Sequence, residues 1–230
     1  MPLPKRLIQH AARSLLPSTW RRKPPPVLVV VEGVYDIEFL RRISKMLHSH
    51  DGAHPNLGQM EQRGELVFVP FGGGTPGHWT HRLAGLQHPE FHLYDREVPP
   101  ETEARQEAAA VVNCRPRCRA VLTSKRNLEN YVSPAAIQEA IGVEGHFTDQ
   151  DNIPELIARR WHRQRRRPCR WEDLPRRAQQ RDRNRVKRLL NTKAVDRMTP
   201  ERLFQQDQDG EVVSWLKGIA QLGRAEQQEK

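Results

Sequence analysis

The chain has 230 residues, of which 37% are hydrophobic, enough to bury a core in one domain with an extension or in two small domains. Its 38 Lys and Arg residues against 28 Asp and Glu give a formal charge of +10, which favours a polyanionic partner such as nucleic acid. No apolar run is long enough to span a bilayer, and three cysteines without zinc-ligand spacing argue against a disulfide framework or a zinc site, so we expect a cytoplasmic globular protein.

Residues 1–26 are predicted to form a basic arm and a proline linker. Six Lys and Arg residues and no Asp or Glu lie between Met1 and Lys23, and Pro24–Pro26 then form a stiff spacer. A mitochondrial presequence has a similar composition, but so do the basic arms of nucleic-acid-binding proteins, which we favour.

A buried strand, an acidic turn and a helix open the predicted globular part. The five apolar residues at 27–31 suit a strand that is covered on both faces, as in a parallel sheet. Glu32 stands where this strand ends, Gly33 permits a tight turn, and apolar residues from Ile37 onward recur at helical spacing. Ligands of open α/β sheets bind at the carboxyl ends of the strands, so Glu32 and Asp36 are candidate site residues.

Further strands are predicted at residues 65–70, 91–94 and 119–122, with helical segments between them. Residues 48–64 are expected to be a loop. The glycine-rich turn at 71–77 lacks the Gly-Lys-Ser/Thr ending of a phosphate-binding loop, although its backbone amides could approach a phosphate or simply form a tight turn. This order of strands and helices predicts the α/β class, with a parallel sheet and flanking helices.

Acidic residues follow three of the four predicted strands. Besides Glu32 and Asp36, Asp95 and Glu97 follow the third strand and Glu129 follows the fourth. Carboxylates at neighbouring strand ends repel one another unless a cation neutralises them, and oxygen ligands suit Mg²⁺ or Mn²⁺. We therefore predict that these five residues bind one or two such ions, which can activate water for in-line attack on a phosphodiester.

These motifs resemble those of the TOPRIM domain of topoisomerases, primases and OLD-family nucleases. The resemblance rests on Val31-Glu32-Gly33 followed by Asp36, and on Asp95 and Glu97 after a later strand. It implies a metal-dependent phosphoryl-transfer domain at residues 27–135, in which Glu32 matches the glutamate of the family and Asp95 its first aspartate. Glu97 departs from the pattern, because the family has a second aspartate there.

Leu128–Tyr131, with the sequence Leu-Glu-Asn-Tyr, resembles the OLD-like and stand-alone TOPRIM proteins rather than the topoisomerases. OLD nucleases carry an ATPase domain whose phosphate-binding loop this sequence does not contain. The resemblance therefore implies that control by ATP either comes from a separate ATPase or other partner protein or does not exist.

The C-terminal part, residues 136–230, is predicted to be a helical, basic domain. Between Arg159 and Arg188 there are fourteen Lys and Arg residues against three Asp and Glu, an excess larger than that of the whole chain. Trp161 and Trp171 lie in this stretch, a pattern that suits contact with a nucleic-acid backbone and stacking on unpaired bases. A solvated helical face is the alternative. The predicted DNA-binding residues are Arg163, Arg165, Arg166, Arg167, Arg170, Arg181, Arg185, Lys187 and Arg188.

The predicted function is that of a metal-dependent endonuclease acting on DNA. Glu32, Asp95 and Glu97 are its predicted catalytic carboxylates, and Lys125 or Arg126 would neutralise charge on the phosphate in the transition state. Two alternatives stay open. One is a primase-like or RNA-processing TOPRIM enzyme, and the other is a non-catalytic DNA-binding or regulatory protein.

Overall fold

The computed structural model of the chain describes residues 24–165 and 169–228. The predicted basic arm up to Lys23 lies outside the described residues, and so do Arg166 and Arg167 of the predicted DNA-binding set. Within the described part, no helix is long and apolar enough to cross a membrane.

A four-stranded parallel sheet forms the centre of the α/β part. Its strands are β1 (Val27–Val31), β2 (Leu66–Pro70), β3 (Glu90–Tyr94) and β4 (Cys118–Leu122), in the order β2-β1-β3-β4. Each pair is parallel, with Val29 opposite Phe68 on one side and Phe91 on the other. The predicted α/β class with a parallel sheet is therefore confirmed, and the carboxyl ends of all four strands meet at one edge.

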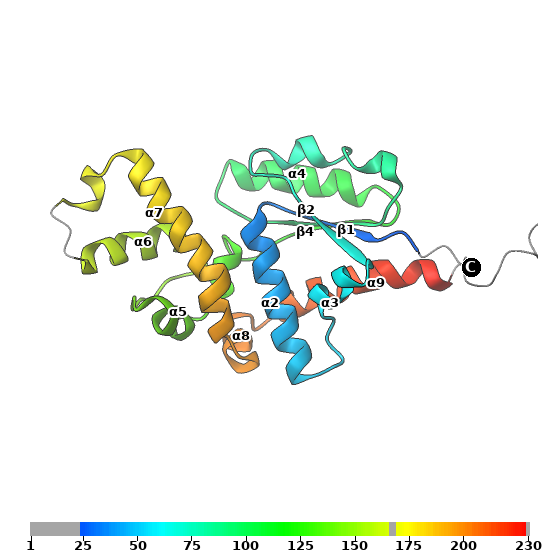
Figure 1. Cartoon of the computed structure of the whole chain (residues 1–230). Helices are drawn as coiled ribbons and strands as arrows, with labels where there is room; N and C mark the ends of the chain where they lie inside the picture. Colours follow the sequence, from blue (N-terminus) through cyan, green and yellow to red (C-terminus); the bar gives the residue numbers. More distant parts are fainter. Residues whose placement is uncertain (1–23, 166–168, 229–230) are drawn as a thin grey trace, which may run out of the picture.

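Helices cover both faces of the sheet (Figure 1), which explains why the strands are apolar. The covering helices are α2 (Val34–His50), α4 (Glu101–Asn113) and α9 (Glu211–Gln228). Val27, Val29 and Val31 point into the core that includes α2 and α9, whereas Val30 points into a second core with α4. Side chains of one strand alternate between faces, so β1 anchors both layers.

A helical region lies beside the sheet (Figure 1). It contains α5 (Pro134–Ile141), α6 (Ile153–Gln164), α7 (Arg176–Leu189) and α8 (Pro200–Gln206). Shorter turns connect these elements, namely η4 (Leu128–Tyr131), η5 (Trp171–Asp173), η6 (Leu190–Ala194) and η7 (Val195–Arg197). The prediction that the C-terminal part contains a helical, basic region is thus confirmed.

The C-terminal helix α9 belongs to the α/β layer and not to the helical region to which the sequence analysis assigned it. Val212, Leu216 and Ile219 are buried in the same core as Val27 and Val29 of β1. The predicted boundary after residue 135 therefore does not separate two independent cores.

Part of the predicted loop at 48–64 is helical. Helix α3 (Leu57–Gln62) begins after Asn56, whose side chain accepts a hydrogen bond from the Gln59 amide at 3.1 Å. Leu57 and Met60 are buried against the core. Six residues are too few to show helical periodicity in a polar stretch, so only the tertiary packing reveals this helix.

The predicted helical segment after the glycine-rich turn forms two 3-10 turns, η2 (Pro76–Trp79) and η3 (Ala84–Leu86).

A chain of alternating charges ties α3, α2 and η7 together. Arg41 contacts Glu61 at 2.7 Å and Glu38 at 3.3 Å, while Arg42 contacts Glu38 at 3.0 Å and Asp196 at 2.6 Å. The pairs are half-exposed, so each adds little free energy alone. Together they link the helical region to α2, alongside the core that the two share.

Asp207 caps α9, and we predict that its removal destabilises the fold. Its two carboxylate oxygens accept hydrogen bonds from the amides of Glu211 and Val212 at 2.9 and 2.8 Å, which have no partner within the helix. Asp207→Ala should lower the free energy of unfolding by about 2 kcal/mol in urea titrations. Asp209→Ala removes an exposed charge two residues away and is the matched control. Equal stability of the two variants would contradict this capping role.

Candidate metal centre

Three carboxylates meet at the carboxyl edge of the sheet. Glu32 follows β1, and Asp95 and Glu97 follow the neighbouring strand β3. One oxygen atom of each side chain lies within 4.8 Å of the other two. Asp95 is 4% exposed, whereas Glu32 and Glu97 are half-buried. The structure therefore brings together the three carboxylates that the sequence analysis predicted to be catalytic.

The glycine-rich turn after β2 holds Glu32 in place. The amides of Gly72 and Gly73 donate to the backbone carbonyl of Glu32 at 2.9 and 3.3 Å. Both glycines have φ of +81°, in the left-handed region where a side chain is unfavourable. The expectation that these amides approach a phosphate is not met for these two residues, because Glu32 occupies them.

Asn127 links the other two carboxylates and was missed in the sequence analysis. Its Nδ2 donates to Glu97 at 3.0 Å and to Asp95 at 3.5 Å. The amide of Leu128 donates to the second oxygen of Asp95 at 3.1 Å. Asn127 precedes the short turn η4, and its place after the fourth strand was the signal that could have identified it.

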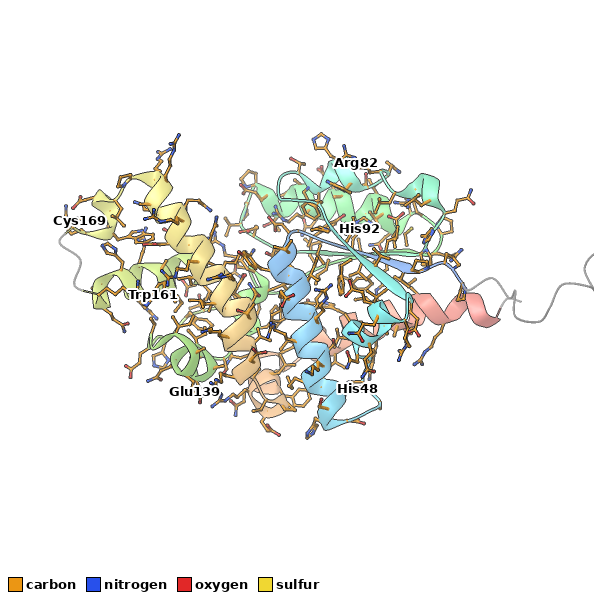
Figure 2. The ribbon with its side chains drawn as sticks, in the orientation of Figure 1. His48, Arg82, His92, Glu139, Trp161 and Cys169 are labelled. Atoms are coloured by element: carbon orange, nitrogen blue, oxygen red, sulfur yellow. The ribbon has the colours of Figure 1, made fainter. Side chains whose placement is uncertain are left out.

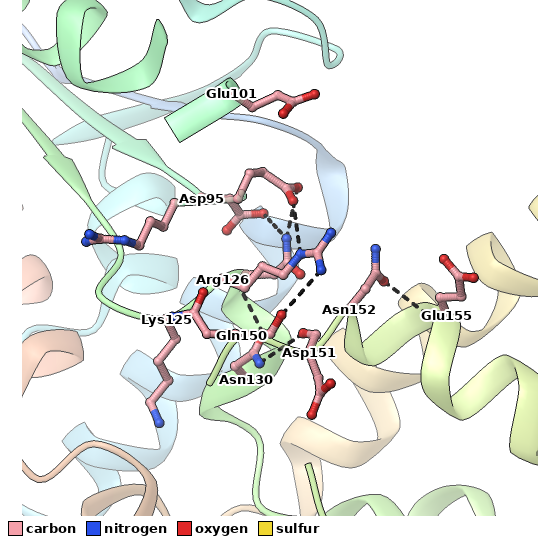
Figure 3. Close-up of polar contacts among 12 residues, drawn as sticks. Asp95, Glu101, Lys125, Arg126, Asn130, Gln150, Asp151, Asn152 and Glu155 are labelled. Atoms are coloured by element: carbon pink, nitrogen blue, oxygen red, sulfur yellow. Dashed lines mark hydrogen bonds and ion pairs between the residues drawn. The ribbon is translucent and has the colours of Figure 1, made fainter. Parts of the chain in front are cut away.

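Two arginines lie at the border of the three carboxylates. Arg126 contacts Glu97 at 3.4 Å and donates to the carbonyl of Gln150 at 3.3 Å, as Figure 3 shows. Arg105 of α4 lies 3.8 Å from Glu32 and is buried. The sequence predicted only a helical segment here, so Arg105 was not among the predicted site residues.

The structure does not bring Lys125 to the carboxylates. Its ammonium group pairs with Asp149 and lies 5.5 Å from the centre of the Tyr131 ring. Figure 3 shows the Lys125 side chain pointing away from Asp95. Of the two cations proposed to neutralise a phosphate, Arg126 is therefore the one at the site.

Asp36 and Glu129 form a second acidic group, next to a lysine of the basic region. The ammonium nitrogen of Lys187 on α7 lies 3.7 Å from each of the two carboxylates. Asn191 donates to Glu129 at 2.5 Å, and Asp36 accepts from the Gly33 amide at 2.7 Å. The five predicted ligands thus divide into a group of three and a pair.

Burial raises the pKa of two carboxyl groups in this region. Desolvation raises the pKa of Asp36 to about 6, although the charge of Lys187 acts in the opposite direction. Burial also raises the pKa of Asp95 well above its usual value, and the neighbouring carboxylates of Asp36, Glu32 and Glu129 add to this. The charge of Glu129 is the main reason that the pKa of Lys187 is raised. The centre is therefore short of positive charge.

The residues fit an oxygen-binding divalent ion. Ligands of one Mg²⁺ lie at most about 4.2 Å apart, so small side-chain movements would let Glu32, Asp95 and Glu97 share an ion. Among residues 24–165 and 169–228, the buried Oδ1 of Asp36 and Oε2 of Glu129 have no hydrogen-bond partner, and the Lys187 ammonium is 3.7 Å from Oδ1 of Asp36. Such atoms cost free energy unless a cation or donor satisfies them, so the pair also suits an ion.

The predicted DNA-binding residues are spread over the two helices of the basic region. Arg163 and Arg165 lie at the end of α6, and Arg170 pairs with Asp173 at 3.1 Å in the connection to α7. The remaining described members lie on α7, namely Arg181, Arg185, Lys187 and Arg188. Lys187 differs from the others because it reaches the carboxylates, and the sequence contains no signal that singles it out.

The two tryptophans of the basic region do not stand free for base stacking, which corrects the expectation from the sequence. Trp161 packs against the core, and the guanidinium carbons of Arg165 and Arg185 lie 3.8 and 5.0 Å from its ring centre. Trp171 is 5% exposed and meets the His162 ring edge-on at 5.7 Å. Figure 2 shows the position of Trp161 in this region.

No family model matches the sequence, and no curated protein matches it either. Among solved structures, the chain is similar to the C-terminal region of the OLD protein of Xanthomonas campestris pv. campestris. The two are 12% identical, with a TM-score of 0.48 over 87% of this chain and 97% of the other. A likeness this distant says nothing about the chemistry of the carboxylates.

Removing Lys187 should destabilise the protein and increase its response to metal. Lys187→Met leaves Asp36 and Glu129 buried without their counter-charge, and because the lysine side chain is 27% exposed we expect a loss of about 2 kcal/mol. Mg²⁺ should restore more stability to this variant than to the wild type, since it binds only the folded form. Urea titrations with Mg²⁺ or EDTA measure this, with the exposed Lys193→Met as control. An equal response to Mg²⁺ in both variants would count against ion binding at the pair.

Gly73 should be needed for metal affinity because it holds the backbone of Glu32. Alanine at φ of +81° costs about 1 kcal/mol, so Gly73→Ala is expected to shift the turn and weaken Mn²⁺ binding measured by calorimetry. Gly77→Ala, in the same turn but without a positive φ, is the control. Wild-type Mn²⁺ affinity in Gly73→Ala would show that this contact does not position Glu32.

Proposed function

We propose that the protein is a Mg²⁺- or Mn²⁺-dependent nuclease that hydrolyses phosphodiester bonds of DNA. The observation that carries this proposal is the meeting of Glu32, Asp95 and Glu97, with one oxygen of each within 4.8 Å. Three carboxylates this close repel one another, so the arrangement favours a bound cation. The TOPRIM-like order of these residues in the sequence supports the same proposal.

Glu32, Asp95 and Glu97 would hold the first ion, and Asp36 with Glu129 would assist it or hold a second. Their ligand atoms are all oxygens, the donors that Mg²⁺ and Mn²⁺ prefer. When bound, such ions lower the pKa of a water molecule and stabilise the leaving oxygen of a phosphodiester. The protein supplies the fixed positions of these oxygens through the glycine-rich turn and Asn127.

Cationic side chains of the chain itself would receive the phosphate. Arg126 and Arg105 border the group of three, and Lys187 stands beside the acidic pair. These groups can balance the negative charge that grows on the phosphate in the transition state. Each of these three cations is paired with a carboxylate. An ion bound by the carboxylates would replace the cationic side chain, which could then contact the phosphate of the substrate.

Two of the three tyrosines, Tyr94 and Tyr131, are not available as nucleophiles. The hydroxyl of Tyr131 bonds to Glu211, and that of Tyr94 bonds to His92 at 2.8 Å. Both side chains are fully buried, and burial raises the pKa of both hydroxyls. Neither is placed to form a covalent link to a nucleic acid.

A non-catalytic nucleic-acid-binding protein is the second candidate, and Lys187 favours it. Its ammonium already neutralises part of the charge of Asp36 and Glu129 without a metal. Calorimetry separates the two candidates, because DNA binding without detectable Mg²⁺ or Mn²⁺ binding would support the second.

Glu32→Gln and Asp95→Asn should each abolish metal-dependent cleavage while DNA affinity stays equal or rises. Both changes remove a ligand charge, and they also remove repulsion toward the DNA backbone. Supercoiled, linear and single-stranded DNA are incubated with Mg²⁺, Mn²⁺ or EDTA, alongside an RNA strand and a nucleotide-polymerisation reaction. Glu103→Gln, an exposed carboxylate of α4, is the control. Cleavage that persists in the Glu32→Gln/Asp95→Asn double variant would refute the assignment of the site.

A further inference from the structure

Helix α7 carries a line of arginines that form no ion pair with the part of the chain that the structure describes. The helix has seven Lys and Arg residues and one Asp. At 3.6 residues per turn, Arg177, Arg181 and Arg188 project within about 40° of one another. All three are exposed, and none forms an ion pair within residues 24–165 and 169–228. We call these three residues the α7 stripe.

Neighbouring arginines of the basic region are used inside the fold instead. Arg183 contacts Glu155 at 3.4 Å, Arg159 contacts the same carboxylate at 2.8 Å, and Arg170 contacts Asp173. The basic residues of α7 therefore fall into two groups. Arg183 pairs with a carboxylate of α6 and stabilises the hairpin, whereas the positive charges of the α7 stripe are exposed to solvent.

The stripe leads to the candidate metal centre. Arg188 is the last member, and the adjacent Lys187 reaches Asp36 and Glu129 at 3.7 Å. From Arg177 to Arg188 the helix rises about 16 Å. Duplex DNA carries a negative charge about every 1.7 Å along its axis, so a duplex along the stripe would offer several phosphates and bring its backbone to the carboxylates.

The ring of Trp161 holds two arginines beside the stripe, Arg165 and Arg185. The guanidinium groups of Arg165 and Arg185 over its ring are within the range of cation–π attraction. A side chain held in this way loses less freedom when it binds a phosphate. Because the ring is also partly buried against the core, these guanidinium groups compete with a base for the surface of the ring that remains.

We propose that the α6–α7 hairpin binds duplex DNA through its phosphate backbone alone, with the α7 stripe as the contact line and Trp161 as the residue that positions Arg165 and Arg185. This deepens the proposed function, on which it rests for the identity of the nucleic acid, but binding itself requires no turnover. Recognition is then independent of base sequence. The higher charge density of a duplex makes it the tighter ligand.

Fluorescence anisotropy with the full chain in EDTA tests this mode of binding. Three DNA probes of equal length are compared: a duplex, a single strand, and a single strand made of abasic sites. We expect the two single strands to bind within about twofold of each other, and the duplex to bind more tightly. Stacking would favour the base-containing strand by about tenfold for each stacked base, and that result would overturn the proposal.

Two sets of variants separate the stripe from general electrostatics. Arg181→Gln/Arg188→Gln should flatten the slope of log affinity against log salt on the duplex by nearly two units, at about 0.9 for each lost phosphate contact. Arg63→Gln/Arg224→Gln removes the same charge from two exposed residues, one directly after α3 and one on α9, and should leave the slope unchanged. Equal slopes for the two double variants would overturn the proposal.

Trp161→Leu tests the positioning role. It should weaken binding of all three probes by the same factor, whereas a loss confined to the base-containing single strand would show that Trp161 stacks on bases. Glu32→Gln should keep the wild-type salt slope. Absence of cleavage with these binding results intact would refute the proposed nuclease function alone, and cleavage with a stripe-independent slope would refute the stripe alone.

Discussion

Negative charge concentrated at one edge of a parallel sheet is the constraint on which this structure depends. Parallel strands end on the same side, so Glu32 and Asp95 meet because β1 and β3 are neighbours in the sheet. Burial makes their repulsion costly, as the raised pKa of Asp95 indicates. The amide of Leu128 donates to Asp95 and the side chain of Asn127 donates to Glu97, and Arg105 lies beside Glu32, so donors and cations offset part of this repulsion.

Helix α7 connects this charged edge to the basic region. One of its residues, Lys187, reaches the buried pair of Asp36 and Glu129, while its arginines face α6 or solvent. The same helix therefore takes part in the electrostatics of the candidate metal centre and carries the proposed contact line for DNA. The two sets of residues lie next to each other on α7, because Lys187 contacts the carboxylates and Arg188 is the last member of the stripe.

The helical region is packed against the α/β part and shares a buried core with it. Helix α9 returns to the sheet and buries Val212 and Leu216 beside β1, and Glu211 at its start bonds to Ser124 after β4. The charge chain through Arg42 and Asp196 adds a second link to α2. Rigid connections of this kind keep Lys187 at a defined distance from the carboxylates.

The sequence by itself determined the four strands, their parallel direction and the carboxylates that follow three of them, because apolar runs followed by acidic turns are typical of a parallel sheet with a site at the carboxyl ends of its strands. The order of the strands in the sheet, and the division of the five predicted ligands into a group of three and a pair, came only from the structure. The sequence also located the positive charge in residues 159–188. Only the tertiary structure decided which of these charges have partners. Lys125 and Lys187 look alike in the sequence, yet Lys125 turns to Asp149 and Lys187 to Asp36 and Glu129. Likewise, the sequence pattern does not show whether Trp161 faces solvent or the guanidinium groups of Arg165 and Arg185. Contacts between residues on different helices depend on how the helices pack.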